Sequence, residues 1–193
     1  SPNTNNAKLF TGKALSFNGN DYVDVDWLKS YTFDSSSSYT ISFRFFNEGG
    51  DSCIMGANWG GGQEFAIHRY SGKLNVAWGS INYTSSTVTT GTIPTITDDT
   101  WYNVVIKVSG LTMTCYLDGV EQYSRLNASS FTTDAGGFAI GRRGDGSSLY
   151  YSGRLSNIQA WDKSFSSTDI AFDYNNPNLL AIDNPDSNLV AAD

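Results

Sequence analysis

The sequence offers a single histidine, His68, for any catalytic triad or dyad. Its neighbours Ile67 and Arg69 place it in the middle of a strand-like run, where an exposed histidine without a catalytic role is the simplest interpretation. The chain contains no G-x-S-x-G motif, which would present a serine nucleophile on a sharp turn. Catalysis by a serine or cysteine nucleophile is therefore not expected.

Metal-binding chemistry is better represented by oxygen ligands than by nitrogen or sulfur. The chain has no Cys/His cluster of the zinc type. Its acidic and asparagine-rich turns contain the carboxylate and carbonyl oxygens that calcium prefers. The candidates for a structural calcium site are Asn18, Asn20 and Asp21 in the first turn, with Asp162 after the last strand. Ordinary turns use the same residue types, so both interpretations stay open.

Exposed aromatic residues beside polar groups suggest carbohydrate binding. A flat ring offers an apolar face to the C–H side of a sugar, and neighbouring polar groups bond its hydroxyls. Aromatic residues make up 14% of the chain, more than its core requires. Burial and exposure are equally compatible with the sequence around the aromatic candidates. The candidate ligand-binding residues are Trp59, His68, Arg69, Tyr83, Arg142, Asp145, Tyr150 and Tyr151.

The tripeptide Arg143-Gly144-Asp145 is one that some adhesive proteins use to reach integrins. Its glycine- and serine-rich surroundings predict an exposed loop. Three residues in a chain with 19 glycines carry little specificity, so adhesion through this motif is a minor hypothesis.

The elements that must position these residues are β-strands. The stretch from Trp101 to Gln122 alternates apolar and polar side chains with a period of two, which is typical of strands that bury one face. Turns at Ser109-Gly110 and Asp118-Gly119, where positive φ is needed, divide it into a hairpin whose second strand ends in another tight turn. One face of this hairpin carries Val104, Ile106, Val108, Leu111, Met113, Cys115 and Leu117.

Similar alternation recurs along the chain. Residues 39–46 are predicted to be a strand with Ile41, Phe43 and Phe45 inward and Thr40, Ser42 and Arg44 outward. Short strands with turn residues between them, at this even spacing, indicate a β-sandwich. Ser166 and Asp169 have capping-box spacing and predict a single helical turn. The other strands are predicted at 14–26 (with a turn at 18–19), 53–57, 65–69, 73–78, 81–84, 138–141 and 154–161.

Length and charge limit the function further. The 193 residues suit one sandwich domain. The net charge of −7 argues against nucleic acid or an anionic membrane as a partner, because both require a basic face. No apolar run is long enough for membrane insertion, and no signal peptide is recognised at the start of the sequence. We interpret this start as that of a fragment or a mature form. For Cys53 and Cys115 we favour two buried free thiols over a disulfide.

Four segments together resemble the laminin G-like and pentraxin-like domains of the concanavalin A-like lectin/glucanase superfamily. The resemblance covers about residues 13–176, and it implies an antiparallel two-sheet jelly roll with at most one short helix. Many domains of this kind bind calcium, which supports the calcium hypothesis. The segments are ALSFNGNDYVDVD at 14–26, YTISFRFF at 39–46, WYNVVIKVSGLTMTCYLDG at 101–119, and FAIGRR with YYSGRLSNIQAW at 138–161.

The resemblance also indicates which acidic residues a catalytic domain of this fold would need. Glucanases of this fold place three acids on one strand, as E-x-D-x-x-E or E-x-D-x-E, so that one acts as nucleophile and another as acid. The three glutamates here, Glu48, Glu64 and Glu121, start no such pattern. We therefore expect a domain that is not an enzyme.

The tail, residues 177–193, lies outside the resemblance. Its SNLVAAD segment looks like the first strand of such a domain. The tail is therefore either a linker into a following domain, which we prefer, or an edge strand of the same sandwich through Leu189–Ala192.

These observations predict a non-catalytic binding or adhesion module. Its expected partner is a glycan or a glycoprotein surface, and its expected setting is a larger extracellular or particle-associated protein. The alternative is a structural decoration or fibre domain on a virus (phage) particle, where contacts with other virion or extracellular subunits would be its function. The two hypotheses are compatible if the particle protein also binds host glycans.

Overall fold

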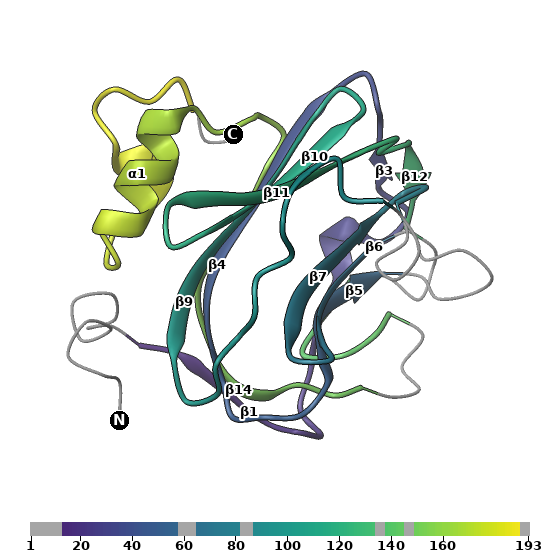
Figure 1. The fold of residues 1–193 in the computed structure, drawn as a ribbon, viewed down its shortest axis with the longest axis vertical. Helices are drawn as coiled ribbons and strands as arrows, with labels where there is room; N and C mark the ends of the chain where they lie inside the picture. Colours follow the sequence, from purple (N-terminus) through teal and green to yellow (C-terminus); the bar gives the residue numbers. More distant parts are fainter. Residues whose placement is uncertain (1–12, 58–64, 82–86, 134–137, 145–148, 190–193) are drawn as a thin grey trace.

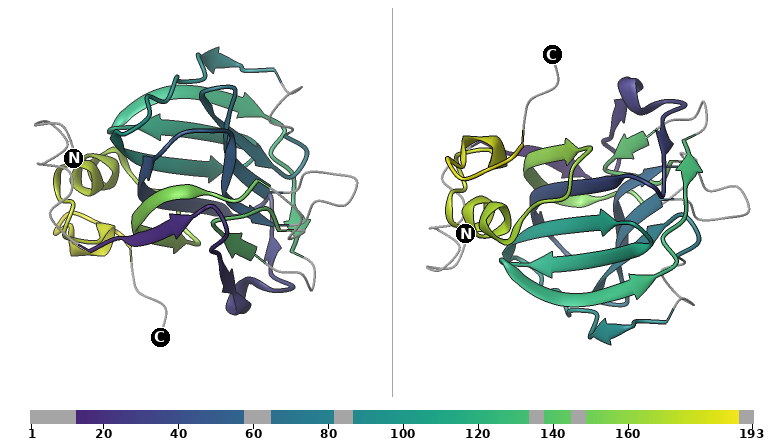
Figure 2. Two further views of the ribbon diagram at one scale, coloured as in Figure 1. Left: turned by 90° about the horizontal axis from the view of Figure 1, so that it is seen from below. Right: turned by 90° about the horizontal axis from the view of Figure 1, so that it is seen from above.

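A computed structural model describes residues 13–57, 65–81, 87–133, 138–144 and 149–189, and in these parts the chain is built mainly from antiparallel strands. Two sheets face each other, and a helix lies against the outer face of the larger one (Figures 1 and 2). Among the described helices, none is both long and apolar enough to cross a membrane. The predicted all-β sandwich is confirmed.

The larger sheet has seven strands in the order β1, β14, β4, β9, β10, β11, β8. The smaller sheet has five, in the order β2, β13, β5, β6, β7. The bounds in the larger sheet, in that order, are Leu15–Asn18, Ser152–Trp161, Ser38–Asn47, Trp101–Ser109, Thr112–Leu117, Val120–Leu126 and Thr90–Gly91. The bounds in the smaller sheet are Val23–Val25, Phe138–Ile140, Ser52–Ala57, Phe65–Tyr70 and Lys73–Trp78.

Short elements complete the fold. A two-stranded ribbon pairs β3 (Thr32–Phe33) with β12 (Phe131–Thr132). The helix α1 spans Ser167–Asn175, and single 3-10 turns lie at Asp26–Leu28 (η2) and Ala181–Asp183 (η3). The capping box is confirmed, since the Ser166 hydroxyl accepts from the Asp169 N–H while the Asp169 carboxylate accepts from the Ser166 N–H. The helix continues for nine residues, longer than the single turn that was predicted.

The core lies between the two sheets and follows the predicted alternation. Ile41, Phe43 and Phe45 of β4 point into it, as do alternate residues of the central hairpin. The hairpin turn at Asp118-Gly119 has positive φ at both residues, 51° and 77°, as its sequence predicted. Leu111 differs from the prediction, because it lies in the turn and is exposed.

The outer face of the seven-stranded sheet is covered by a neighbouring part of the chain. Thr40, Ser42 and Arg44 do point away from the core, but all three are buried. The cause is α1 with the segments on either side of it: Phe165, just before the helix, and Ile170, within it, pack on Val105. The outward-facing side chains are therefore covered rather than exposed to solvent.

The polar side chains under α1 converge on one carboxylate. The Asp173 carboxylate accepts hydrogen bonds from Ser42 Oγ at 2.6 Å and from Asn103 Nδ2 and Gln159 Nε2, each at 2.8 Å. Arg44 donates to the backbone carbonyls of Asp173 and Tyr174. Burial lowers the pKa of the Arg44 guanidinium, while the charge of Asp173 acts in the opposite direction. A polar network thus joins the helix to β4, β9 and β14.

The described part of the tail, residues 177–189, packs on the same face as α1. Ala181 and Leu189 are buried in the cluster that contains Ile170, and Ala181 N donates to Gln159 Oε1 at 3.0 Å. No strand pairing of the tail occurs among its described residues, and 190–192, part of the proposed edge strand, lie outside them.

Both cysteines are buried and no disulfide joins them, as we favoured from the sequence. Cys53 lies in β5 of the smaller sheet and Cys115 in β10 of the larger one. Burial raises the pKa of the Cys115 thiol to about 12, so it remains protonated and behaves as a small apolar side chain.

Candidate binding site at one end of the sandwich

One end of the sandwich holds three of the eight predicted ligand-binding residues, Arg142, Tyr150 and Tyr151, with Arg69 directly beside it. We define this rim as residues 18–22, 48–51, 70–73, 92–100 and the described parts of 141–151. Strand register places these segments together, because Asn18 pairs with Ser152, and the next residue, Gly153, pairs with Asn47. In Figure 1 the rim lies at the lower end of β1 and β14.

Two tyrosines and an arginine form the aromatic part of the rim. The Arg142 guanidinium lies over the Tyr22 ring, 3.8 Å from its centroid, and its Nη2 lies 2.9 Å from Asp24 Oδ1. The Tyr150 ring is tilted against that of Tyr22, with centroids 6.4 Å apart. Tyr22 is 47% exposed, and Tyr150 is half-buried. We call Tyr22, Asp24, Arg142 and Tyr150 the tyrosine–arginine cluster.

Backbone pairing positions this cluster. Asp24 of β2 lies opposite Ala139 of β13, which brings the side chain of Asp24 close to the residues that follow β13. Gly141 has a φ of +89°, and a Cβ there would lie 2.6 Å from the Phe17 ring. Gly19 N donates to Tyr151 O at 3.1 Å, which ties the first turn to the same loop. The cluster is therefore held in place by β1, β2, β13 and the loop that follows β13.

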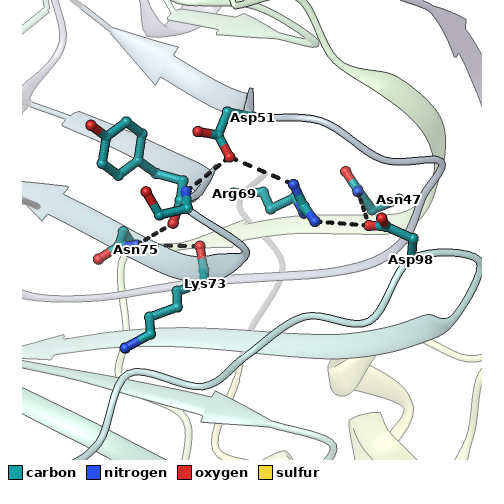
Figure 3. Close-up of polar contacts among 8 residues, drawn as sticks. Asn47, Asp51, Arg69, Lys73, Asn75 and Asp98 are labelled. Carbon is teal, nitrogen blue, oxygen red and sulfur yellow. Dashed lines mark hydrogen bonds and ion pairs between the residues drawn. The ribbon is translucent and has the colours of Figure 1, made fainter.

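Arg69 occupies a second polar cluster at the rim (Figure 3). Its guanidinium lies between two carboxylates, with Nη2 3.0 Å from Asp98 Oδ1 and Nη1 3.5 Å from Asp51 Oδ1. Asn47 Nδ2 donates to Asp98 at 3.0 Å, and Ser71 N donates to Asp51 at 2.8 Å. These contacts hold the segment 92–100 against the β6–β7 hairpin. Arg69 was predicted to contact ligand, whereas its described contacts join parts of the rim to each other.

Two predicted ligand residues are corrected by their burial. Tyr151 is 0% exposed, its hydroxyl donates to Phe46 O at 2.8 Å, and its ring packs edge-on against Phe17. His68 is also 0% exposed, so the expectation of an exposed strand histidine is wrong. Burial, reinforced by the charge of Arg143, lowers the pKa of His68 to about 4. Neither side chain can reach a ligand in this structure.

Three other candidates, Trp59, Tyr83 and Asp145, lie outside the described residues. The Asp145 end of the Arg143-Gly144-Asp145 tripeptide is among them. Trp78 is buried in the core.

The calcium candidates separate into two places. Asn18 pairs with Ser152, the first residue of β14, whereas Asp162 follows Trp161, the last residue of β14. The length of an extended strand separates these two places by about 30 Å. Within the turn, Asn18 Oδ1 accepts from Asn20 N at 3.0 Å and Asp21 Oδ2 accepts from Asn18 N at 3.3 Å. The side chains of the turn thus offer one carboxylate and the amide oxygens of Asn18 and Asn20, fewer than the six or more oxygens that calcium takes. The described residues include no group of three or more His, Cys, Asp or Glu placed to hold a metal.

The four candidates therefore do not fit one calcium ion. Calcium binding at the turn alone stays a prediction, and it is tested by the melting midpoint of the domain with and without a chelator. Because ligation would tie the turn to the rest of the rim, a structural ion predicts a lower midpoint when calcium is removed. An unchanged midpoint would contradict it.

The family model described as the concanavalin A-like lectin/glucanases superfamily matches residues 17–171 of the chain. The chain belongs to this superfamily. The resemblance to laminin G-like and pentraxin-like domains is thereby confirmed. No curated protein sequence matches the chain.

Solved structures of the superfamily share the fold at low identity. A native heptameric SAP-like pentraxin from Limulus polyphemus is 18% identical, with a TM-score of 0.57 over 82% of this chain and 80% of that chain. Domain 4 of AbnA, a GH43 extracellular arabinanase from Geobacillus stearothermophilus, is 18% identical, with a TM-score of 0.61 over 83% of this chain and 75% of that one. Domains LG4-5 of the mouse laminin alpha1 chain are 14% identical, with a TM-score of 0.58 over 79% and 44%. The chain thus spans less than half of the laminin pair.

Two members of the tyrosine–arginine cluster, Tyr22 and Asp24, were not among the sequence candidates. A signal for them was present, because the alternation in 22–26 places Tyr22 and Asp24 on the face opposite Val23 and Val25. The sequence alone does not show that Asp24 pairs with Arg142, because the two residues are 118 positions apart.

Proposed function

We propose that the domain is a non-catalytic carbohydrate-binding module, and that sugars bind at the tyrosine–arginine cluster. The observation that carries this proposal is the pair of rings from Tyr22 and Tyr150 at the rim, beside an arginine fixed in place. An exposed ring stacks on the C–H face of a sugar, and carboxylate and guanidinium groups bond its hydroxyls. Asp24 and Arg142 supply such groups within the cluster.

Structural relatives support the proposal. Domain 4 of AbnA was solved in complex with arabinotriose, and another relative is described as a putative carbohydrate binding protein from Bacteroides ovatus. We infer a similar class of partner for this chain, either a free glycan or a glycoprotein surface. The corresponding setting is a larger protein on the outside of a cell or on the surface of a particle.

The positions of the carboxylates support a function without catalysis. A retaining glycosidase needs two carboxyl groups about 5 Å apart that both face the substrate. Asp51 and Asp98 instead share the Arg69 guanidinium, and Glu48 lies 3.4 Å from Arg154. Glu121 accepts a hydrogen bond from the Tyr116 hydroxyl at 3.2 Å. In the described residues these carboxylates serve structural contacts.

A glycan array tests the proposal. We expect the purified domain to bind a defined subset of printed oligosaccharides, and a variant with both Tyr22→Ala and Tyr150→Ala to lose those signals. Because both rings are at the surface, the double variant should keep the fold, which the melting midpoint checks. Binding of no glycan by the wild-type domain, with or without calcium, would contradict the proposed function.

A further inference from the structure

We propose that Asp24 sets the charge class of the ligand: by holding the Arg142 guanidinium, it makes the tyrosine–arginine cluster select neutral glycans over acidic ones. This inference rests on the proposed function and adds the class of sugar to it. Asp24 is a positioning residue in this account, because it acts on the ligand through Arg142.

The contacts of Arg142 are those of a group already held on two sides. The ring of Tyr22 covers one face of the guanidinium, and Asp24 Oδ1 accepts from Nη2 at 2.9 Å. An unpaired arginine would bind a carboxylate through two parallel hydrogen bonds. Here a carboxylate of the protein already holds Nη2 and neutralises the guanidinium charge, so an acidic sugar competes with Asp24 for it, whereas a neutral hydroxyl can bond to the pair as it stands.

The charge of the surroundings acts in the same direction. Besides Arg142, two arginines at this end are paired with acids: Arg69 with Asp51 and Asp98, and Arg154 with Glu48. With Asp24 included, these described pairs set three guanidinium groups against four carboxylates. The other described charges of the rim are two positive, Lys73 and Arg143, and two negative, Asp21 and Asp99, so the carboxylates stay in excess by one. The whole chain carries a net charge of −7. A uronic or sialic acid approaching the rim therefore meets repulsion in addition to the competition from Asp24.

Two other described carboxylates lie near Asp24 along the chain, and each has a contact of its own. Asp26 forms an ion pair with Lys29, and the Asp21 carboxylate accepts a hydrogen bond from Asn18 N at 3.3 Å. Removing the charge of Asp24 alone should therefore leave Arg142 stacked on Tyr22 with its outer N–H groups open to a ligand.

The experiment compares wild type, Asp24→Asn and Glu48→Gln on neutral oligosaccharides printed beside acidic counterparts, namely galactotriose with trigalacturonate and lactose with sialyllactose. Wild type should prefer the neutral members. Asp24→Asn should bind the acidic members about tenfold more tightly than wild type does, because a charged hydrogen bond becomes available. Glu48→Gln, which frees Arg154 outside the cluster, should show no such gain, and Asp24→Glu should restore the neutral preference.

Salt supplies a second measurement that needs no variant. Raising ionic strength from about 0.05 to about 0.5 M should leave wild-type binding of neutral sugars unchanged and weaken its discrimination against acidic ones. Wild type that prefers acidic sugars, or neutral binding without a gain in Asp24→Asn, would overturn this inference while leaving the proposed function intact. A wild-type domain that binds no glycan would overturn the proposed function, and this inference with it.

Discussion

Replacing Asp173 with alanine is expected to lower the free energy of unfolding by about 3–5 kcal/mol. This is the range for removing one partner of a buried charged pair while the other partner stays buried. Three donors, from Ser42, Asn103 and Gln159, would lose their acceptor in a site closed to water. The Arg44 guanidinium, itself buried, would lose the opposite charge that acts on it most strongly. Each buried donor without a partner costs about 1–3 kcal/mol, so the effect exceeds that of an ordinary surface change.

The measurement is urea unfolding followed by tryptophan fluorescence, with Asp186→Ala as the matched control. Asp186 is an exposed aspartate of the tail, so its replacement should change the unfolding free energy by less than about 0.5 kcal/mol. If Asp173→Ala and Asp186→Ala unfold at the same urea concentration, the network does not join α1 to the sheet in the way described.

A second large effect is expected from pH, through His68. The folded pKa of His68 is about 4, below the ordinary value of 6.5. Between these values the unfolded chain binds a proton that the folded chain does not. Stability is therefore complete above pH 6.5 and decreases as pH falls toward 4, by up to about 3 kcal/mol. Burial is the main cause, the charge of Arg143 adds to it, and Asp51 opposes it.

The test compares unfolding free energies of wild type and His68→Gln from pH 7.5 down to pH 4. Glutamine does not titrate, so the difference between the two curves isolates the histidine from the carboxylates that titrate in the same acid range. The stability of wild type should fall faster than that of the variant between pH 6.5 and 4. Parallel curves would show that His68 accepts a proton in the folded domain without cost.

Much of the fold could be predicted because strand patterns are local. In 101–117 alternate side chains face the core, and glycine or aspartate stands where φ is positive, so the hairpin follows from neighbouring residues alone. The capping box before α1 is equally local. Alternation also assigned Arg44 to the outer face of its strand correctly.

The alternation of apolar and polar residues does not indicate which part of the chain covers the outer face of a strand. Arg44 is buried by a helix 129 residues further along, so its pattern is that of an exposed arginine while its environment is not. Tyr150 and Tyr151 show the same difficulty on a smaller scale. They are neighbours in one glycine-flanked pair, yet Tyr151 reaches the carbonyl of Phe46 and is buried, while Tyr150 remains at the surface. Only the packing of distant segments distinguishes them.

Sugar affinity before and after removal of one ring tests the central claim most directly. The measurement is a calorimetric titration with the neutral oligosaccharide that gives the strongest array signal, using wild type, Tyr150→Ala and, as control, Tyr70→Ala. Tyr70 is an exposed tyrosine of the β6–β7 hairpin, outside the tyrosine–arginine cluster. We predict that Tyr150→Ala weakens binding about tenfold, or about 1.4 kcal/mol, while Tyr70→Ala leaves it unchanged. Equal affinity of Tyr150→Ala and wild type would contradict a sugar site at the tyrosine–arginine cluster.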